Sequence, residues 1–365
     1  MIEHILPGGD LLCHDNRAMV IELKSPRRVL STSFLNGGFR EDLTNLFNYS
    51  EVYGVADERC EMRAPTNEGH LAVIADELGL NPETTAGLST AAKMKYLQVK
   101  SVNYDDFTLT AAVTAGIDIS GNRVGDPSSW HEKDGIPMPA AFGTINIVLH
   151  IDALLAPGAL TRVLSICTEA KTAALQEVLA QSCFSKGLAT GSGTDGTIVV
   201  CRLDSPVRLT NAGTHSKLGE YIGRLVKETV IDALVAENGF RSYARGSLLK
   251  RVSRFGIDEE RIWDEYLKLN QSEQGGREQF RARFSEINKN EAIILQVTLL
   301  GHLIDLLQWK MADTAEVLKA AEPLLSGIGS PQLNWTDPDK YNVLNADQLA
   351  EELRSLLISR LASCL

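Results

Sequence analysis

A glycine-rich polar segment, Ala189 to Gly196, carries the residue types best suited to chemistry in this 365-residue chain. It reads Ala-Thr-Gly-Ser-Gly-Thr-Asp-Gly and formally contains G-x-G-x-x-G. A dinucleotide fingerprint must follow a strand and open a helix. Here a predicted helix precedes the segment and a predicted strand, Gly196 to Leu203, follows it, so we exclude nicotinamide or flavin binding. What remains is a loop whose backbone N–H groups could bind an oxyanion, or a plain tight turn. Its hydrogen-bonding or proton-transfer candidates are Ser192, Thr194 and Asp195.

A second group of candidate residues lies within a predicted helix, Ala156 to Gln181. Thr168 and Lys171 are three residues apart and share a helix face, so the lysine could activate a hydroxyl nucleophile. Glu169 adds a carboxylate for acid–base or orienting work. The same residues are typical of the solvated edge of an amphipathic helix, and both interpretations stay open.

A third candidate is His215, in a polar segment that precedes the predicted helix Lys217 to Ala236. Near the positive end of a helix dipole an imidazole tends to stay neutral, so it could accept a proton near neutral pH. Ser216 or Thr214 as an N-cap, with the histidine merely exposed, explains the segment equally well.

Two further polar loops follow predicted strands. Asn36-Gly37 ends the predicted strand Arg28 to Leu35, and Asn122 to Asp126 follows the predicted strand Phe107 to Ile117. Each loop alone is typical of a hairpin or surface turn. If these loops converge with the glycine-rich segment, they build one concave site rich in backbone donors. The histidines lack H-x-x-x-H or H-x-H spacing, so a metal site would need scattered ligands, and we expect no structural metal. We also expect no cofactor.

The first two thirds of the chain mix β-branched runs with helical periodicity. Predicted strands are Ala18 to Leu23, Arg28 to Leu35, Phe107 to Ile117, Gly143 to Ile151 and Gly196 to Leu203. Predicted helices are Gly69 to Leu80, Glu83 to Tyr96, Ala156 to Gln181 and Lys217 to Ala236. Several strands follow one another without a helix between them. We therefore predict an α+β fold with a mixed, largely antiparallel sheet packed with helices.

Beyond residue 246 the pattern is helical with almost no strand signal, and we place a domain boundary near 245. The predicted domains are an α+β domain, 1–245, and an all-α C-terminal domain, 246–365. Predicted helices there are Asp258 to Leu269, Arg277 to Ile287, Asn290 to Met311, Thr314 to Leu325 and Ala346 to Leu361.

Composition excludes several classes of protein. Hydrophobic residues make up 44% and charged residues 23%, as in ordinary globular domains. The formal net charge is −11, so nucleic acid is not an expected partner. The most apolar stretch, Ala292 to Trp309, is interrupted by Gln296, His302 and Asp305, so we expect a core helix and no membrane span. The N-terminus lacks the pattern of a signal peptide and the cysteines form no C-x-x-C pair, so we expect a cytoplasmic protein.

Five segments in order, over about residues 15 to 236, together resemble the adenosylcobinamide amidohydrolase family of corrinoid salvage enzymes. They are Ser31 to Gly38 with Asn45, Thr114 to Asp126, Gly143 to Asn146, Thr168 to Leu175, and Ala189 to Asp195 with Gly213 to Gly219. No single motif is specific, but the order and spacing together identify the family.

The resemblance implies hydrolysis of the amide that links the aminopropanol arm to the corrin ring of adenosylcobinamide, giving adenosylcobyric acid. Such a reaction needs attack by water, stabilisation of an oxyanion and protonation of the leaving amine. Our hypothesis gives proton transfer to Asp195 or His215, with Glu169 and Lys171 as second choices. The expected substrate-binding residues are Asn36, Gly37, Asn122, Asp126, Asn146, Thr190, Gly191, Ser192, Gly193 and Thr194.

Two alternatives to this hydrolase remain at the level of sequence. One is a corrinoid-binding or sensing protein that keeps the pocket without hydrolysis. The other is an unrelated amide hydrolase that uses Thr168 and Lys171. The resemblance does not cover residues 246–365, which could be an oligomerisation or partner-binding module, a lid over a bulky corrinoid, or a divergent appendage.

Overall fold

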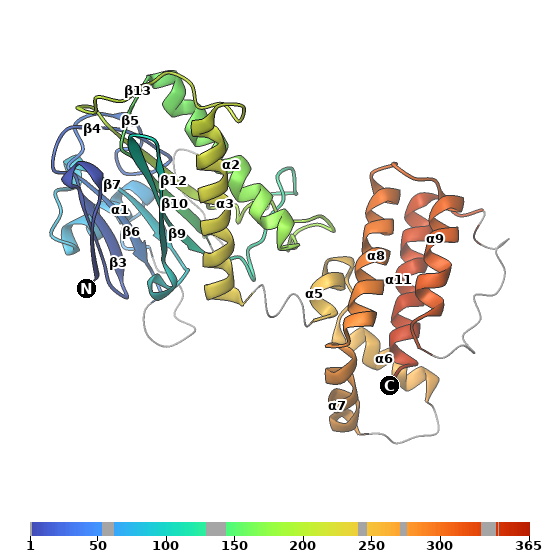
Figure 1. The fold of residues 1–365 in the computed structure, drawn as a ribbon. Coiled ribbons are helices and arrows are strands. Elements are labelled where there is room, and N and C mark those ends of the chain that lie inside the picture. Colours follow the sequence, from blue (N-terminus) through green and yellow to red (C-terminus); the bar gives the residue numbers. More distant parts are fainter. Residues whose placement is uncertain are drawn as a thin grey trace. The chain divides into compact units, whose positions relative to one another are not determined.

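The computed structural model describes residues 2–52, 62–128, 144–239, 247–270, 276–329, 341 and 343–365. The chain divides into two compact units, Met1–Gly239 and Phe240–Leu365 (Figure 1). The first unit contains sheets and helices, and the described part of the second is helical. The predicted α+β class with a helical C-terminal segment is therefore confirmed. The boundary that we predicted near residue 245 falls outside the described residues.

Two large sheets pack face to face in the first unit. The strands of the five-stranded sheet, in spatial order, are β1 (Ile2–Ile5), β2 (Leu11–His14), β3 (Ala18–Glu22), β6 (Asn45–Ser50) and β7 (Thr85–Thr90). Those of the six-stranded sheet are β5 (Gly38–Arg40), β4 (Arg27–Ser31), β12 (Gly196–Arg202), β10 (Ile145–Ile151), β9 (Phe107–Ala115) and β8 (Gln98–Tyr104). The β6–β7 and β10–β12 pairs are parallel, and the other pairs in these sheets are antiparallel. A short parallel pair joins β11 (Leu154–Leu155) to β13 (Arg208–Leu209).

Apolar side chains from the facing sides of the two sheets form the core between them. Leu12, Met19 and Leu46 project from the five-stranded sheet and meet Val148 and Ile198 of the six-stranded sheet. Alternate residues of a strand point to opposite faces, so each sheet has a second face to cover. Helices cover these outer faces and complete a four-layer arrangement.

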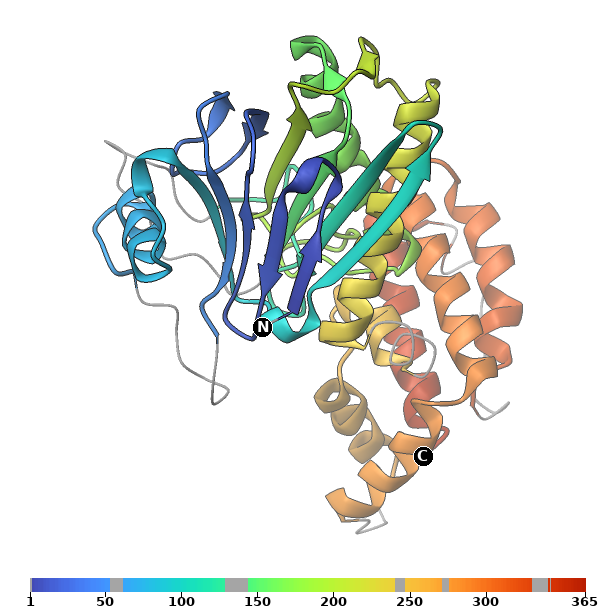
Figure 2. The same cartoon turned by 60° about the vertical axis from the view of Figure 1, so that its left-hand side comes forward.

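The helix on the five-stranded sheet is α1 (Asn67–Glu77), whose Leu71 and Ile74 pack with Phe47 and Tyr49 of β6. The outer face of the six-stranded sheet is covered by α2 (Pro157–Glu177) and α3 (Lys217–Asn238), which also pack on each other. Figure 2 shows α1 on one side of the paired sheets and the green and yellow helices on the other.

The register of three strands defines one end of the first unit, the end at which β10 and β12 begin. Asn146 pairs with Gly196 at the start of these parallel strands. The antiparallel strand β9 ends there, since Ala115 pairs with Ile145. Segments that precede β12, precede β10 or follow β9 therefore meet at this end. We call it the loop end.

The predicted helix Glu83 to Tyr96 is wrong. The segment forms β7 and, after a turn, a single helical turn of 3₁₀ type at Met94–Tyr96. Its middle residue Gly87 lies so close to Phe47 that a Cβ atom would stand 2.0 Å from the ring. Pairing with β6 decides the conformation of this segment, because tertiary contacts override helix propensity.

Most other predicted elements are present with shifted ends. The five predicted strands correspond to β3, β4, β9, β10 and β12, and residue 143 of the fourth lies outside the described residues. The strands β1, β2, β5, β6, β8, β11 and β13 were not predicted. Short helical turns of 3₁₀ type also occur at Pro7–Gly9, Pro82–Thr84 and Ser253–Phe255.

The described part of the second unit is a set of helices around their own apolar core. They are α5 (Leu249–Val252), α6 (Glu259–Leu269), α7 (Arg277–Ile287), α8 (Glu291–Gln308), α9 (Thr314–Ser326) and α11 (Ala346–Ala362). Asp313 and Asn345 cap α9 and α11 with reciprocal capping boxes. By length and composition α8 could cross a membrane, and it is the one such helix among the described residues. Its Val297, Leu300 and Ile304 lie in the core of this unit.

Candidate active site

A lysine and an aspartate meet at the loop end of the first unit. Asp195 directly precedes β12, and Lys171 lies near the end of α2, which runs back toward the start of β10. The Lys171 ammonium contacts Oδ2 of Asp195, and the two side chains are 11% and 12% exposed. Little solvent reaches this pair, so its charges interact more strongly than those of a surface pair.

Ser192 binds the same carboxylate through both its hydroxyl and its backbone. The Oγ–H donates to Asp195 Oδ1 at 2.5 Å, and Ser192 N lies 3.1 Å from each carboxylate oxygen. Ile145 N, at the start of β10, donates to Oδ1 at 3.0 Å. The carboxylate is thus held from three directions, with a hydroxyl proton aimed at it.

The glycines of this loop allow the close approach. A Cβ atom on Gly191 would stand 2.2 Å from Asp195 Oδ2 and 3.0 Å from Lys171 Nζ. Gly193 has φ +81°, a conformation that favours glycine. Among the described residues no acceptor faces Gly193 N, and this residue is exposed. The loop therefore leaves the Gly193 N–H available as a donor beside the partly buried Lys171–Asp195 pair.

The Asn122 loop packs against the glycine-rich loop, as predicted for convergence. Asn122 N donates to Gly191 O at 2.8 Å, and Thr190 N donates to Asn122 O at 2.8 Å. Val124 N donates to the Thr190 hydroxyl at 2.8 Å. The structure thus brings together Asn122, Lys171, Asp195 and the loop residues Thr190 to Thr194.

Asp126 anchors this neighbouring loop. Burial acts to raise the pKa of its carboxyl, but hydrogen bonds from Ser182, Ser185 and the Arg123 backbone outweigh it and hold that pKa below the usual value of 3.8. The Ser182 hydroxyl donates to Asp126 at 2.5 Å and Arg123 N donates at 2.9 Å. Asp126 is an ionised internal acceptor that shapes the loop near Thr190.

A hydroxyl pair lies on the other side of Ser192. Thr144 and Thr194 are 2.9 Å apart at their Oγ1 atoms, and Thr194 Oγ1 is 3.3 Å from Ser192 Oγ. The three hydroxyls therefore lie in one hydrogen-bonded row that ends at Asp195. Such a row can hold a water molecule or a substrate polar group beside the carboxylate.

Asn146 lies at the loop end but points into the protein. Its amide N–H groups donate to Asn48 Oδ1 at 2.8 Å and to Ser89 O at 2.9 Å, and its Oδ1 accepts from Gly196 N at 3.0 Å. The residue is 1% exposed. Both donors are used internally, so Asn146 does not present a donor to a substrate carbonyl in this structure.

Asn36 and Gly37 form a tight turn away from the Lys171–Asp195 pair. The Asn36 amide donates to the carbonyls of Pro82 and Thr85 at 2.6 and 2.8 Å, at the start of β7. A Cβ on Gly37 would stand 1.9 Å from Ser33 O. These contacts match the turn interpretation, and they leave the Asn36 amide protons no free position for substrate.

His215 lies at the opposite end of the first unit, which corrects the expectation that it shares a pocket with Asp195. The chain leaves β12 at Arg202 and reaches His215 just before α3 begins. Near its start α3 contacts the β8–β9 turn, where the Tyr221 and Tyr104 rings are 4.8 Å apart. That turn pairs with the end of β10, so the length of β12, about 20 Å, separates the two residues.

Glu169 is exposed on α2 with no partner among the described residues. The Thr168 hydroxyl donates to Leu164 O of its own helix at 3.2 Å, while Lys171 pairs with Asp195. Thr168 and Lys171 therefore form no nucleophile–base pair in this structure.

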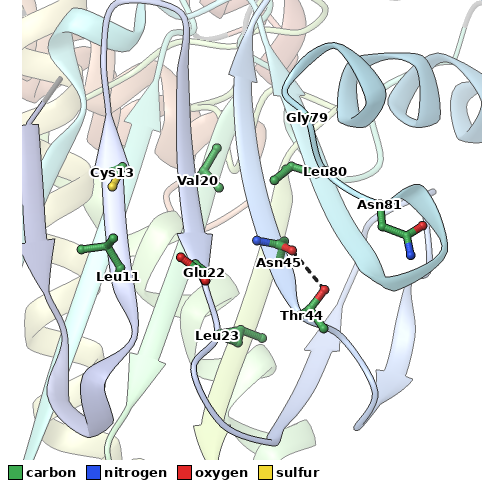
Figure 3. Close-up of a pocket in the computed structure, with 10 residues that line it drawn as sticks. All are labelled: Leu11, Cys13, Val20, Glu22, Leu23, Thr44, Asn45, Gly79, Leu80 and Asn81. Atoms are coloured by element: carbon green, nitrogen blue, oxygen red, sulfur yellow. Dashed lines mark hydrogen bonds between the residues drawn. The ribbon is translucent and has the colours of Figure 1, made fainter.

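Within the described residues, neither a metal cluster nor the hollow on the five-stranded sheet coincides with the site. Among the described residues, no group of three or more His, Cys, Asp or Glu side chains could hold a metal ion. A hollow of about 480 Å³ lies on the outer face of the five-stranded sheet (Figure 3). Glu22 and Asn45 line it on the side of that sheet opposite the inter-sheet core, away from Lys171 and Asp195.

Comparison with known proteins finds a family model, a relative and a solved structure that match this chain. A family model described as adenosylcobinamide amidohydrolase matches residues 9–242, which confirms the resemblance seen in the sequence. The chain is 35% identical over 240 residues to the uncharacterized protein MJ1613 of Methanocaldococcus jannaschii, covering 63% of this chain and 90% of the relative. It also aligns with the crystal structure of the PH0078 protein from Pyrococcus horikoshii OT3, with 14% identity, a TM-score of 0.30, and coverage of 65% of this chain and 82% of that chain.

Proposed function

The chain belongs to the adenosylcobinamide amidohydrolase family, and on that premise we propose that it hydrolyses the amide between the aminopropanol arm and the corrin ring of adenosylcobinamide. The products are adenosylcobyric acid, which re-enters corrinoid assembly, and aminopropanol. The observation that carries the proposal is the Asp195 carboxylate, which is held by Lys171 and Ser192 inside the segment that matches the family. A salvage reaction of this kind suits the cytoplasm, the location that we expect from the sequence.

Asp195 is the proposed proton-transfer group. Its carboxylate takes a proton from the attacking oxygen, either a water molecule or the Ser192 hydroxyl that already donates to it at 2.5 Å. The same proton then passes to the amide nitrogen, so that the amine leaves as the C–N bond breaks. With water as the nucleophile this gives the acid directly. With Ser192 it leaves an ester on the serine, and a water molecule that gives its proton to Asp195 then cleaves this ester to the acid and returns the Ser192 hydroxyl. Attack on the carbonyl carbon and loss of the amine thus need one residue that accepts and returns a proton.

Two neighbours complete the proposed chemistry. Gly193 N makes no backbone hydrogen bond within the described residues and is the proposed donor to the oxyanion that forms on the substrate carbonyl. Lys171 keeps the Asp195 carboxylate in place and balances its charge in a site with little solvent. Asn122 and Asp126 act through the loop that supports Thr190.

The direct test is incubation of the purified full chain with adenosylcobinamide, with detection of free aminopropanol and of adenosylcobyric acid. Asp195→Asn should lower kcat by about 10²-fold or more, because a carboxamide cannot accept the proton. Asp152→Asn is the matched control, since Asp152 pairs with Arg202 at 2.8 Å, is 17% exposed, and lies at the opposite end of β10 and β12. Binding of adenosylcobinamide without product release would instead favour a corrinoid-binding or sensing role.

A further inference from the structure

A row of buried amide and hydroxyl groups joins the two sheets beneath the start of β12. Gly196 N donates to Asn146 Oδ1 at 3.0 Å, Asn146 Nδ2 donates to Asn48 Oδ1 at 2.8 Å, and Asn48 Nδ2 donates to Thr114 Oγ1 at 2.8 Å. Asn146 also donates to Ser89 O at 2.9 Å. The side chains of Asn48, Thr114 and Asn146 belong to residues that are each 1% exposed. We call this set the amide row.

The amide row has a single direction. Gly196 N is a donor, so the atom of Asn146 that faces it must be the oxygen, and the nitrogen then faces the oxygens of Asn48 and Ser89. The same reasoning makes Asn48 donate to Thr114. A flipped amide would place like groups against each other in a site that water does not reach, and each unpaired buried group costs about 1–3 kcal/mol.

Asn146 is linked to two backbone positions that help to place Asp195. Its side chain binds the amide of Gly196, the residue that follows Asp195, and its backbone follows Ile145, whose N–H donates to the Asp195 carboxylate. Gly196 has no room for a side chain, because a Cβ there would stand 2.6 Å from Leu88 and 2.8 Å from Asn146 Oδ1. The close contacts of Gly196 therefore fix the distance between the start of β12 and the five-stranded sheet.

We propose that Asn146, Asn48 and Thr114 are positioning residues for Asp195. Through Gly196 N and the start of β10 they set where the carboxylate stands relative to Lys171 and Ser192. The five-stranded sheet, which supplies Asn48, thus contributes to the site without touching it. The effect on hydrolysis rests on the proposed function, whereas the effect on the Asp195 loop does not.

Two threonines on β9 provide a matched test. Thr114→Val removes the acceptor for Asn48, and Thr110→Val removes a hydroxyl that is equally buried, at 2% exposure, but bonds Ser101 at 2.8 Å toward the other end of β9. Thr114→Ser keeps the hydroxyl and serves as the conservative rescue. If Thr114→Val does not fold, Asn48→Ser replaces it, because it breaks the same bond.

The first measurement is hydrogen–deuterium exchange of peptides that cover residues 190–197 in the full chain. Thr114→Val should speed exchange there by about 10-fold, since it loosens the groups that hold the Ser192 and Gly196 amides. The second measurement is the kinetics of adenosylcobinamide hydrolysis. We expect kcat to fall by about 10-fold with KM changed by less than about 2-fold, because the carboxylate is misplaced while the substrate surface is intact.

Thr110→Val and Thr114→Ser should match the wild type in both measurements. Equal exchange of residues 190–197 in Thr114→Val and Thr110→Val overturns the positioning role. If Thr114→Val speeds exchange but leaves kcat unchanged, the amide row positions the loop without affecting catalysis. This result overturns the catalytic consequence of the positioning role and leaves the proposed function standing. A third outcome is that Thr114→Val speeds exchange of residues 190–197 and Thr110→Val does not, while the wild-type protein releases no aminopropanol. This outcome supports the positioning of Asp195 and overturns the proposed function alone.

Discussion

One strand carries two buried polar clusters of opposite character. Asn146 and His150 lie four residues apart on β10 and so point to the same face, toward the five-stranded sheet. At the loop end Asn146 belongs to the neutral amide row. At the other end His150 Nε2 is 2.9 Å from Asp10 Oδ2, and the Arg27 guanidinium binds the same carboxylate at 2.7 and 2.8 Å. Both clusters join the two sheets, but only one of them contains charges.

The charged cluster is fully enclosed. Asp10 and Arg27 are 0% exposed and His150 is 1% exposed. Burial acts to raise the pKa of Asp10, but hydrogen bonds from His150, Arg27 and the Lys24 backbone outweigh it and hold that pKa below 3.8. The amide row can fix the position of Asp195 without adding a net charge next to the Lys171–Asp195 pair. From this difference we infer that the charged cluster mainly stabilises the fold, whereas the amide row mainly fixes the position of Asp195.

The largest expected effect is on stability and comes from Asp10→Asn. This change removes the buried carboxylate of Asp10 and leaves the buried Arg27 guanidinium with the longer contact to the exposed Asp204, at 3.5 Å. Loss of one partner of a buried ion pair typically costs about 3–5 kcal/mol of unfolding free energy. Urea unfolding followed by circular dichroism measures the loss. Hydrolysis per folded molecule should stay within about 2-fold of the wild type, because Asp195 lies at the other end. If Asp10→Asn lost hydrolysis without losing stability, the charged cluster would not have the purely stabilising role that separates it from the amide row.

The same carboxylate predicts the direction of acid sensitivity. The folded-state pKa of Asp10 lies below its ordinary value of 3.8, so its ionised form stabilises the fold above that value. This contribution is lost as the pH falls from 3.8 through the lower folded-state pKa. The unfolding free energy of the wild type should therefore drop over that range, and the slope should be shallower in Asp10→Asn. Equal slopes for the two proteins would contradict the assignment.

The next effect is on the loop and compares two of its glycines. Gly191→Ala places a Cβ atom 2.2 Å from Asp195 Oδ2, so the carboxylate must move and kcat should fall by about 10-fold or more. Gly193→Ala has its nearest neighbour at 3.9 Å, in Asn122, and at φ +81° it should cost about 1 kcal/mol of stability with a smaller loss of kcat. Steady-state kinetics beside thermal unfolding measures both. Equal losses of kcat would show that the contact with Asp195 is not what makes Gly191 necessary.

The sequence could predict the elements whose pattern is local. The apolar stripes of α2 and α3 and the β-branched runs of β9, β10 and β12 identified those elements, and the residue types of the 189–196 loop singled out Asp195. The helix predicted at Glu83 to Tyr96 failed because β7 depends on pairing with β6, which is distant in the sequence until the fold forms. Short strands such as β1 and β2 carry too few residues to show a period.

The candidate site was only partly predictable, because it too depends on contacts between residues that are distant in the sequence. Lys171 was a candidate, but its partner Asp195 is 24 residues away and is brought to it by the reversal of the chain after α2. Asn48 was not singled out, and Thr114 was named only as the first residue of a segment that resembles the family. A polar side chain within an otherwise apolar strand is a signal that could have found both. Which end of β12 a loop occupies depends on strand direction, which the residue types of the His215 segment do not reveal.

The smallest expected effect is that of His215→Ala. His215 is exposed and precedes α3 at the end of the unit that holds the charged cluster, about the length of β12 away from Asp195. Its removal should change kcat by less than about 2-fold and leave the pH dependence of kcat unaltered, since no proton of the reaction passes through it. The helix keeps its N-cap, because the Ser216 hydroxyl accepts from Gly219 N at 3.1 Å, so stability should also be preserved. Steady-state hydrolysis measured across pH checks both statements. A loss of kcat of about 10-fold or more would place the reacting amide at the end of β12 remote from Asp195, and would make the charged end, rather than the loop end, the site of chemistry.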